Sequence, residues 1–146
     1  MRISREQMLM EMAHIASKRG TCGRLAVGAV IAREGRPISI GYVGAPSGDP
    51  HCSSETCPDL SAPCNRTKHA ELNAIDFAKA HDINVEGADI YVTDSPCQMC
   101  AAEIVLAGIR RVFFDRQYRD PAGIEKLKRE DLEVTQVLPN GMTRRF

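Results

Sequence analysis

The sequence lacks tryptophan, an excess of charge of either sign and any long apolar run. Its aromatic residues are few, with 3 Tyr and 4 Phe among 146 residues. The 19 Lys and Arg side chains are matched by 19 Asp and Glu, so the formal net charge is zero. Proteins whose affinity depends on neutralising a long phosphate backbone carry an excess of basic side chains. We therefore expect a small-molecule partner and no nucleic acid, although one or two arginines could still hold a single phosphate.

No segment approaches the roughly 18 consecutive apolar residues that a membrane-spanning helix needs. Residues 1–4 begin a polar, amphipathic stretch that differs from the apolar part of a secretion signal. We therefore expect a cytoplasmic protein with no membrane partner, in a compartment where thiols stay reduced. The six cysteines are accordingly predicted to be metal ligands or plain thiols, and not disulfides.

Internal repeats, low-complexity tracts and linkers between two cores are absent as well. A chain of this length can bury a hydrophobic core without cross-links. The contents of 43% hydrophobic and 26% charged residues lie in the ordinary range of globular proteins. The prediction is one domain that covers residues 1–146.

The first part of the chain predicts a helix followed by a hairpin. The Ser-Arg-Glu-Gln run at residues 4–7 has the arrangement of a capping box, and apolar residues at helical spacing extend the helix to about Arg19. Residues 25–33 and 37–43 are rich in Val and Ile, and the Glu-Gly-Arg turn between them indicates an antiparallel hairpin. Residues 44–63 are irregular, and a stretch of that length is typical of a functional or cross-linked loop.

Helices and strands alternate over the rest of the chain. The predicted elements are a helix at 69–80, a strand at 89–93, a helix with Pro96 in its first position that stops at Gly108, a strand at 110–114, a helix near 124–129 and a strand at 132–137. Together with the hairpin, this order predicts an α/β fold in which helices pack on a mixed sheet.

Two short motifs at predicted helix starts carry the chemistry. They are His-Ala-Glu at residues 69–71 and Pro-Cys-Gln-Met-Cys at residues 96–100. A Cys-x-x-Cys pair and a distant His suit a tetrahedral Zn²⁺ whose fourth position is left to water. The dipole of a helix N-terminus also favours thiolates. His69, Cys97 and Cys100 are therefore predicted to bind a catalytic zinc.

Glu71 is the one carboxylate within these motifs, and we predict that it moves the protons. Zinc lowers the pKa of its water to about 7, and the resulting hydroxide can attack a ring carbon that bears an amino group. A carboxylate that is not a ligand must then carry a proton to the ring nitrogen and to the departing ammonia. The combination of these motifs is the signature of zinc nucleobase deaminases. His69 and Glu71 can converge only where the helix begins, because residues two apart in a helix point to different sides.

Simpler interpretations remain for the same residues. His69 could be a core histidine and Glu71 a solvated helix charge. Cys97 and Cys100 could form a redox pair, but a thioredoxin-like Trp-Cys context is absent. A structural zinc usually has four protein ligands, whereas only three are evident here.

Motifs in five segments follow one another along the chain: residues 27–30, 41–48, 69–75, 95–100 and 118–123. In this order they resemble the deoxycytidylate (dCMP) deaminase family of the cytidine-deaminase-like superfamily. The resemblance implies a three-layer α/β/α fold with a mixed five-stranded sheet, and hydrolysis of dCMP to dUMP and ammonia in pyrimidine deoxynucleotide metabolism. It also implies a homo-oligomer, often a hexamer, and control by dCTP and dTTP.

The resemblance also implies roles for individual residues. His69, Cys97 and Cys100 would bind the zinc and Glu71 would carry the protons. The backbone N–H of Ala70 would meet the pyrimidine carbonyl.

Three further positions concern the nucleotide. Tyr118 would lie against it, unless it is a core aromatic. Arg24 and Ser47 are weaker candidates for the 5′-phosphate, and for the arginine plain solvation is the default. Val43 departs from the family, whose members usually carry an Asn there that contacts the sugar. An apolar side chain cannot make that hydrogen bond, so a modified deoxycytidylate is an alternative substrate.

The four remaining cysteines form a separate question. Some relatives carry a second, structural zinc in this region of the chain. Four thiolates would close a tetrahedral site and hold the long loop. The predicted ligands are Cys22, Cys52, Cys57 and Cys64, with His51 as an alternative, and free thiols are the other interpretation.

Two rival functions stay open. A deaminase of another base, such as a tRNA adenosine deaminase, shares both zinc motifs, but the zero net charge and the loop at residues 41–48 argue against it. A catalytically silent zinc module is the second rival, and the intact Glu71 argues against that.

Overall fold

The computed structural model describes residues 2–20, 26–44, 68–118 and 120–146. The helices and strands run in the order α1 (Arg5–Ser17), β1 (Gly28–Arg33), β2 (Arg36–Tyr42), α2 (Ala70–Ala80), β3 (Asp89–Asp94), α3 (Gln98–Leu106), β4 (Arg111–Arg116), α4 (Ala122–Arg129), β5 (Glu133–Val137) and β6 (Thr143–Arg145).

The strands form one mixed sheet in the order β2-β1-β3-β4-β5-β6. The central strands β3, β4 and β5 are parallel. β1 runs antiparallel to both β2 and β3, and β6 runs antiparallel to β5. The predicted antiparallel hairpin is confirmed, and its two-residue turn has positive φ at Glu34 and Gly35, as a right-twisted hairpin requires.

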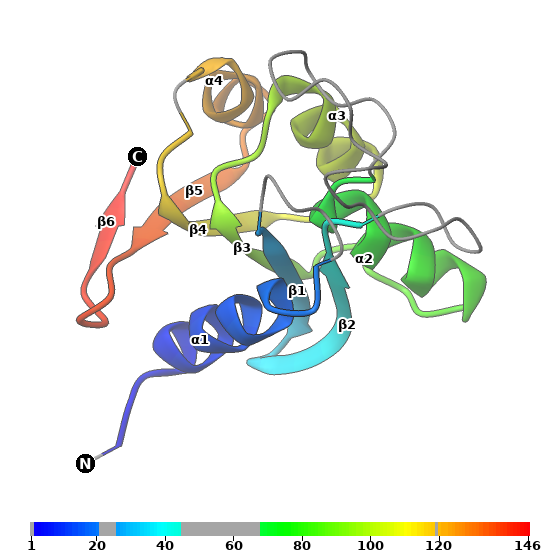
Figure 1. The fold of residues 1–146 in the computed structure, drawn as a ribbon. Coiled ribbons are helices and arrows are strands. Elements are labelled where there is room, and N and C mark those ends of the chain that lie inside the picture. The colour runs from blue at the N-terminus through cyan, green and yellow to red at the C-terminus, as the bar shows by residue number, and fades with distance from the viewer. Residues whose placement is uncertain (1, 21–25, 45–67, 119) are drawn as a thin grey trace, which may run out of the picture.

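Helices cover both faces of the sheet (Figure 1). α1 packs on β1 and β3 from one side, where Leu9 and Ala13 join Val30 and Tyr91 in a small core cluster. α2, α3 and α4 lie on the other side over the larger cluster, which includes the fully buried Phe114. The predicted three-layer α/β/α architecture is therefore confirmed.

Over the described ranges the sheet has six strands where five were expected. β6 is the added strand, and all three of its residues, Thr-Arg-Arg, are exposed. Such a polar run has no alternation of apolar residues from which a strand could be predicted. It forms because a tight turn, in which the Leu138 N–H donates to the Met142 carbonyl at 2.8 Å, returns the chain alongside β5.

The start of α3 also differs from the prediction. Pro96 is not the first helical residue; Cys97 is the N-cap and the helix begins at Gln98. The Cys97 thiol occupies the capping position, because its Sγ accepts from the Cys100 N–H at 3.5 Å. A side-chain acceptor at the N-cap satisfies one of the unpaired N–H groups of the first turn.

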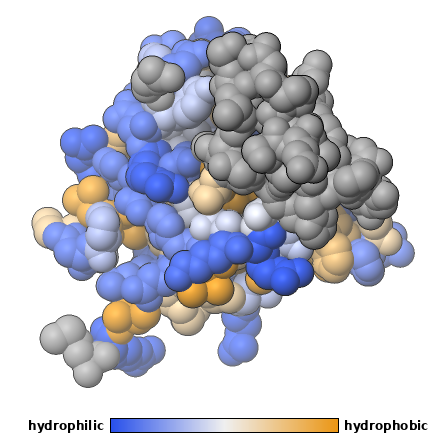
Figure 2. Space-filling model, viewed as in Figure 1, coloured by the Kyte–Doolittle hydropathy of each residue, from blue (hydrophilic) through white to orange (hydrophobic). Residues whose placement is uncertain are grey.

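None of the helices in the described ranges has the length and apolarity of a membrane span. On the face seen in Figure 2, hydrophobic residues lie in separate small patches among hydrophilic ones. Scattered apolar residues of this kind are ordinary on a folded surface.

Candidate metal and catalytic site

Two helix starts on the same side of the sheet bring the predicted ligands together. His69 is the N-cap of α2 and Cys97 is the N-cap of α3, both with extended backbone. α3 follows directly on β3, whose carboxyl end lies beside that of the parallel strand β4. Sites in α/β proteins form at such strand ends, where helix N-termini converge.

The donor atoms of His69, Cys97 and Cys100 all lie within 4.8 Å of one another. His69 Nδ1 is 3.1 Å from Cys100 Sγ and 3.7 Å from Cys97 Sγ. A tetrahedral zinc with ordinary bond lengths separates its N and S ligands by about 3.5 Å. The spacing and the chemistry of this donor set therefore fit zinc, and among the described residues these three side chains form the one group close enough to hold a metal ion.

The two thiols share their protons unequally. Hydrogen bonds from Cys100 and His69 lower the pKa of Cys97 to about 4. The hydrogen bond with Cys97, together with burial, raises the pKa of Cys100 well above its usual range. Cys97 is thus the thiol of the pair that loses its proton more readily. A group that gathers negative charge in this way favours a divalent cation in place of the shared proton.

Glu71 lies in the first turn of α2 and is 4% exposed. Burial raises the pKa of its carboxyl to about 7, even though the α2 backbone and His69 lower it. The carboxyl also meets the Cys100 thiol. The interpretation of Glu71 as a solvated helix charge is therefore wrong. A buried carboxyl beside the ligand group, with a pKa close to neutrality, has the property of a general acid–base residue.

The structure places three further predicted site residues. Ala70 is the first residue of α2, so its N–H has no acceptor within the helix. Tyr118 is 48% exposed, which makes the core-aromatic interpretation wrong. Val43 is 2% exposed and packs in the larger core cluster. Its side chain supports the end of the hairpin, and how the sugar is recognised without the family's Asn stays a question for the proposed function.

The remaining predicted site residues lie outside the described ranges. They are Arg24, Ser47, Cys22, Cys52, Cys57, Cys64 and His51. Phosphate binding and the second zinc therefore stay predictions.

Two residues around the Cys97 turn were not predicted from the sequence. The Ser95 hydroxyl is buried and accepts from the Tyr118 N–H at 2.7 Å, which joins the turn to the chain after β4. Gly123 lies in α4, and a Cβ there would overlap the carbonyl oxygen of Pro96. The sequence contained a signal for this contact: glycine is unfavourable inside a helix, so its presence there indicates a close approach of another group.

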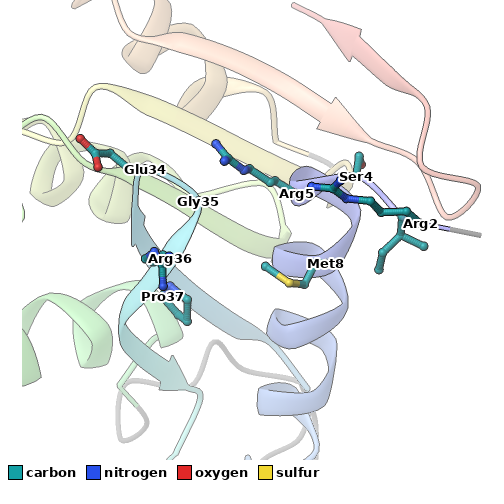
Figure 3. A pocket seen from close by; sticks show the side chains of 9 residues that line it. Arg2, Ser4, Arg5, Met8, Glu34, Gly35, Arg36 and Pro37 are labelled. Atoms are coloured by element: carbon teal, nitrogen blue, oxygen red, sulfur yellow. The ribbon is translucent and has the colours of Figure 1, made fainter.

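A separate cavity of about 670 Å³ lies at the other end of the hairpin, between α1 and the turn from β1 to β2. Figure 3 shows the Arg5 side chain crossing from α1 toward Gly35, with Arg2 and Arg36 nearby. None of the predicted site residues lines it. The exposed guanidinium groups of this groove take no part in the ligand group.

The sequence model described as "Cytidine and deoxycytidylate deaminase zinc-binding region" matches residues 3–116, which include both motifs and all three donors. The chain belongs to this family. Family membership makes it a hydrolytic deaminase with a zinc-binding region.

The chain is similar over most of its length to several known proteins. It is 40% identical over 137 residues to the "ComE operon protein 2" of Bacillus subtilis, covering 93% of this chain and 72% of that protein. It is 33% identical to the deoxycytidylate deaminase of Saccharomyces cerevisiae, covering 93% of this chain and 46% of the yeast protein. The dCMP deaminase of cyanophage S-TIM5, solved in complex with dCMP and dUMP, superposes with a TM-score of 0.83 at 29% identity, covering 93% and 98% of the two chains.

Proposed function

We propose that the chain hydrolyses dCMP to dUMP and ammonia with zinc bound by His69, Cys97 and Cys100. The observation that carries the proposal is a buried Glu71 carboxyl beside three converging metal donors. The choice of dCMP as substrate is supported by a structural likeness that extends over nearly the whole length of both chains. The similar protein is a dCMP deaminase that was solved with dCMP and dUMP.

Glu71 is the acid–base residue of this proposal. When bound, zinc supplies a water of lowered pKa as the nucleophile. The Glu71 carboxylate would accept a proton from the attacking water and deliver it to N3 of cytosine, while the oxygen of the water bonds to C4. It then passes the second proton of the water to the amino group. The C4–N bond breaks, ammonia leaves and the uracil ring remains, so that one water is consumed for each ammonia released.

Two neighbours complete the proposed site. The Ala70 N–H, without an acceptor in the helix, is placed to donate to the carbonyl of the pyrimidine. Tyr118 is exposed and follows β4, at the same edge of the sheet where α3 begins after β3. Its ring is therefore available to a nucleotide. An aromatic ring with one polar end suits a ligand that has both apolar and hydrogen-bonding parts.

The other expectations for this site remain part of the proposal. Residues 1–146 form one deaminase domain, and its support is that the strands of the described residues share one sheet. A second zinc bound by the other cysteines, a homo-oligomer such as a hexamer, control by dCTP or dTTP and a cytoplasmic location are predictions that follow from the sequence.

The test measures the zinc content per chain and the rate of deamination, monitored by ultraviolet absorbance. The substrates are dCMP, CMP, deoxycytidine and 5-methyl-dCMP. Turnover of dCMP above the other three supports the proposal. Preference for 5-methyl-dCMP would indicate that the substrate is a modified deoxycytidylate. Release of ammonia from tRNA adenosine and from none of these compounds would favour the tRNA enzyme. Zinc binding without any turnover would leave a silent zinc module.

A further inference from the structure

The His69 turn depends on contacts from outside its own side chain. His69 is the N-cap of α2, but its side chain makes no capping hydrogen bond. An N-cap residue that does not cap leaves the geometry of its turn to other groups. Contacts from other residues therefore hold the backbone at residues 68–69, which carries the imidazole.

The end of β2 lies against this backbone (Figure 1). Gly44 and Lys68 form an antiparallel bridge, in which the Lys68 N–H donates to the Gly44 carbonyl at 2.8 Å and the reverse bond measures 3.3 Å. The residues that follow β2 and the residue that precedes His69 are thus paired side by side. Two isolated backbone hydrogen bonds are modest in strength, so a further contact at this place matters.

Asn73 supplies that contact. Its side-chain amide donates to the Tyr42 carbonyl at 2.7 Å and, more weakly, to the Lys68 carbonyl at 3.4 Å. Its backbone N–H donates to the His69 carbonyl at 3.0 Å. One residue therefore bonds to the last residue of β2 and to both residues at the start of the metal-binding turn. No other standard side chain of this size offers two N–H donors from one uncharged group.

We propose that Asn73 is a positioning residue for the metal site, whose amide fastens the peptide before His69 to the end of β2. This inference rests on the proposed zinc site, and it concerns what sets the distance from the imidazole to the two thiols. Outer partners that orient a metal ligand change metal affinity or activity by about 10- to 100-fold when they are replaced. Asn73 acts on the backbone of the ligand and touches neither the metal nor the substrate.

The decisive variant is Asn73→Asp, which keeps the shape of the side chain. It replaces the amide nitrogen, which donates to two carbonyls, with a carboxylate oxygen that those carbonyls repel. Asn73→Ala removes the amide without introducing repulsion, and it decides the question if the Asp variant does not fold. Ser39→Ala is the matched control. The Ser39 hydroxyl donates to the Ala74 carbonyl at 2.6 Å, so this variant also breaks a buried bond between β2 and α2, but away from the ligand turn.

Two readouts are independent of turnover. One is the zinc dissociation constant of the site that Cys97→Ser abolishes, measured by competition with a chromogenic chelator. The other is the ligand-field absorption of the cobalt-substituted protein, which reports the geometry of the donors. We expect Asn73→Asp to raise the zinc dissociation constant about 10- to 100-fold and to shift the cobalt bands. Asn73→Ala should change both less, and Ser39→Ala should lower the denaturation midpoint while leaving both unchanged.

Wild-type values of both readouts in Asn73→Asp and Asn73→Ala would overturn the inference, with the proposed zinc site left standing. Equal changes in Ser39→Ala would also overturn it, because the effect would then belong to general packing of α2 on β2. A wild-type protein that takes up no zinc through Cys97 would overturn the proposed function and, with it, this inference.

Discussion

The turns at His69 and Cys97 both start a helix and both carry a predicted metal ligand, but they are held in different ways. Cys97 caps its own helix through its thiol, and α4 presses against the peptide before it where Gly123 meets Pro96. The His69 side chain makes no cap, and its turn is tied to β2 by Asn73 and by the bridge at Gly44. The Cys97 turn thus has close packing against α4 in addition to its own cap, whereas the His69 turn depends on hydrogen bonds from other residues.

A site with three predicted ligands can therefore have one rigid side and one adjustable side. Close packing tolerates almost no added volume. A hydrogen-bonded turn can shift by small amounts when one partner is lost, because each bond contributes only about 1 kcal/mol. We therefore expect substitutions on the Cys97 side to act through steric conflict, and substitutions on the His69 side to act through the direction of the ligand.

The largest expected effect concerns Glu71, which shares the first turn of α2 with the His69 cap. Glu71→Gln should lower kcat for deamination by about 100- to 10,000-fold, because proton transfer is lost while all three metal donors remain. Zinc content should stay at the wild-type level. Glu103→Gln, in the middle of α3, is the matched control and should keep activity. Wild-type turnover by Glu71→Gln would refute the assigned mechanism.

The second effect concerns the tightly packed turn at Cys97. Gly123→Ala should destabilise the protein by about 1–3 kcal/mol, because the added Cβ overlaps the Pro96 carbonyl. It should also raise the zinc dissociation constant about tenfold, since the peptide that must move leads directly into Cys97. Urea unfolding and chelator competition measure the two quantities.

Gly87→Ala is the control for this change. A Cβ at Gly87 meets nothing within 4 Å, but its φ of 77° penalises a side chain, so stability should fall by about 1 kcal/mol with no change in zinc affinity. If Gly123→Ala instead stabilises the protein, as alanine does at an unobstructed helix position, the proposed steric contact is wrong.

The smallest effect concerns Asp94, which ends β3 just before the Cys97 turn and pairs with Arg116 at 2.7 Å. Burial raises the pKa of this carboxyl more than Arg116 lowers it. A carboxyl whose folded pKa is raised adds stability below its unfolded pKa and loses that contribution as the pH rises through the folded pKa. Asp94→Asn, which does not titrate, should therefore gain stability relative to wild type between pH 4 and pH 7, by less than about 1 kcal/mol. Urea unfolding at both pH values measures this, and a relative loss at pH 7 would contradict it.

Local chemistry is enough to propose the reacting residues. His69, Glu71, Cys97 and Cys100 lie in two short motifs, and the spacing of each motif at a helix start is itself the geometric requirement. The helices, the central strands and the three layers also follow from periodicity and from the alternation of elements. The polar strand β6 could not be predicted in this way, because its formation depends on a turn and on a free edge of β5.

The sequence by itself determined the proposed donor set, the proposed acid–base carboxylate and the α/β class, because each of the two motifs is a short run with its own chemical signature and the class follows from the order of periodic elements. Only the tertiary structure decided that Glu71 is buried, that Val43 faces the core and that Tyr118 is exposed. It alone brought Asn73 to Tyr42 and Gly123 to Pro96. These contacts join residues that are 31 and 27 positions apart, and the physical reason they cannot be read from the chain is that burial and long-range pairing are properties of packed elements.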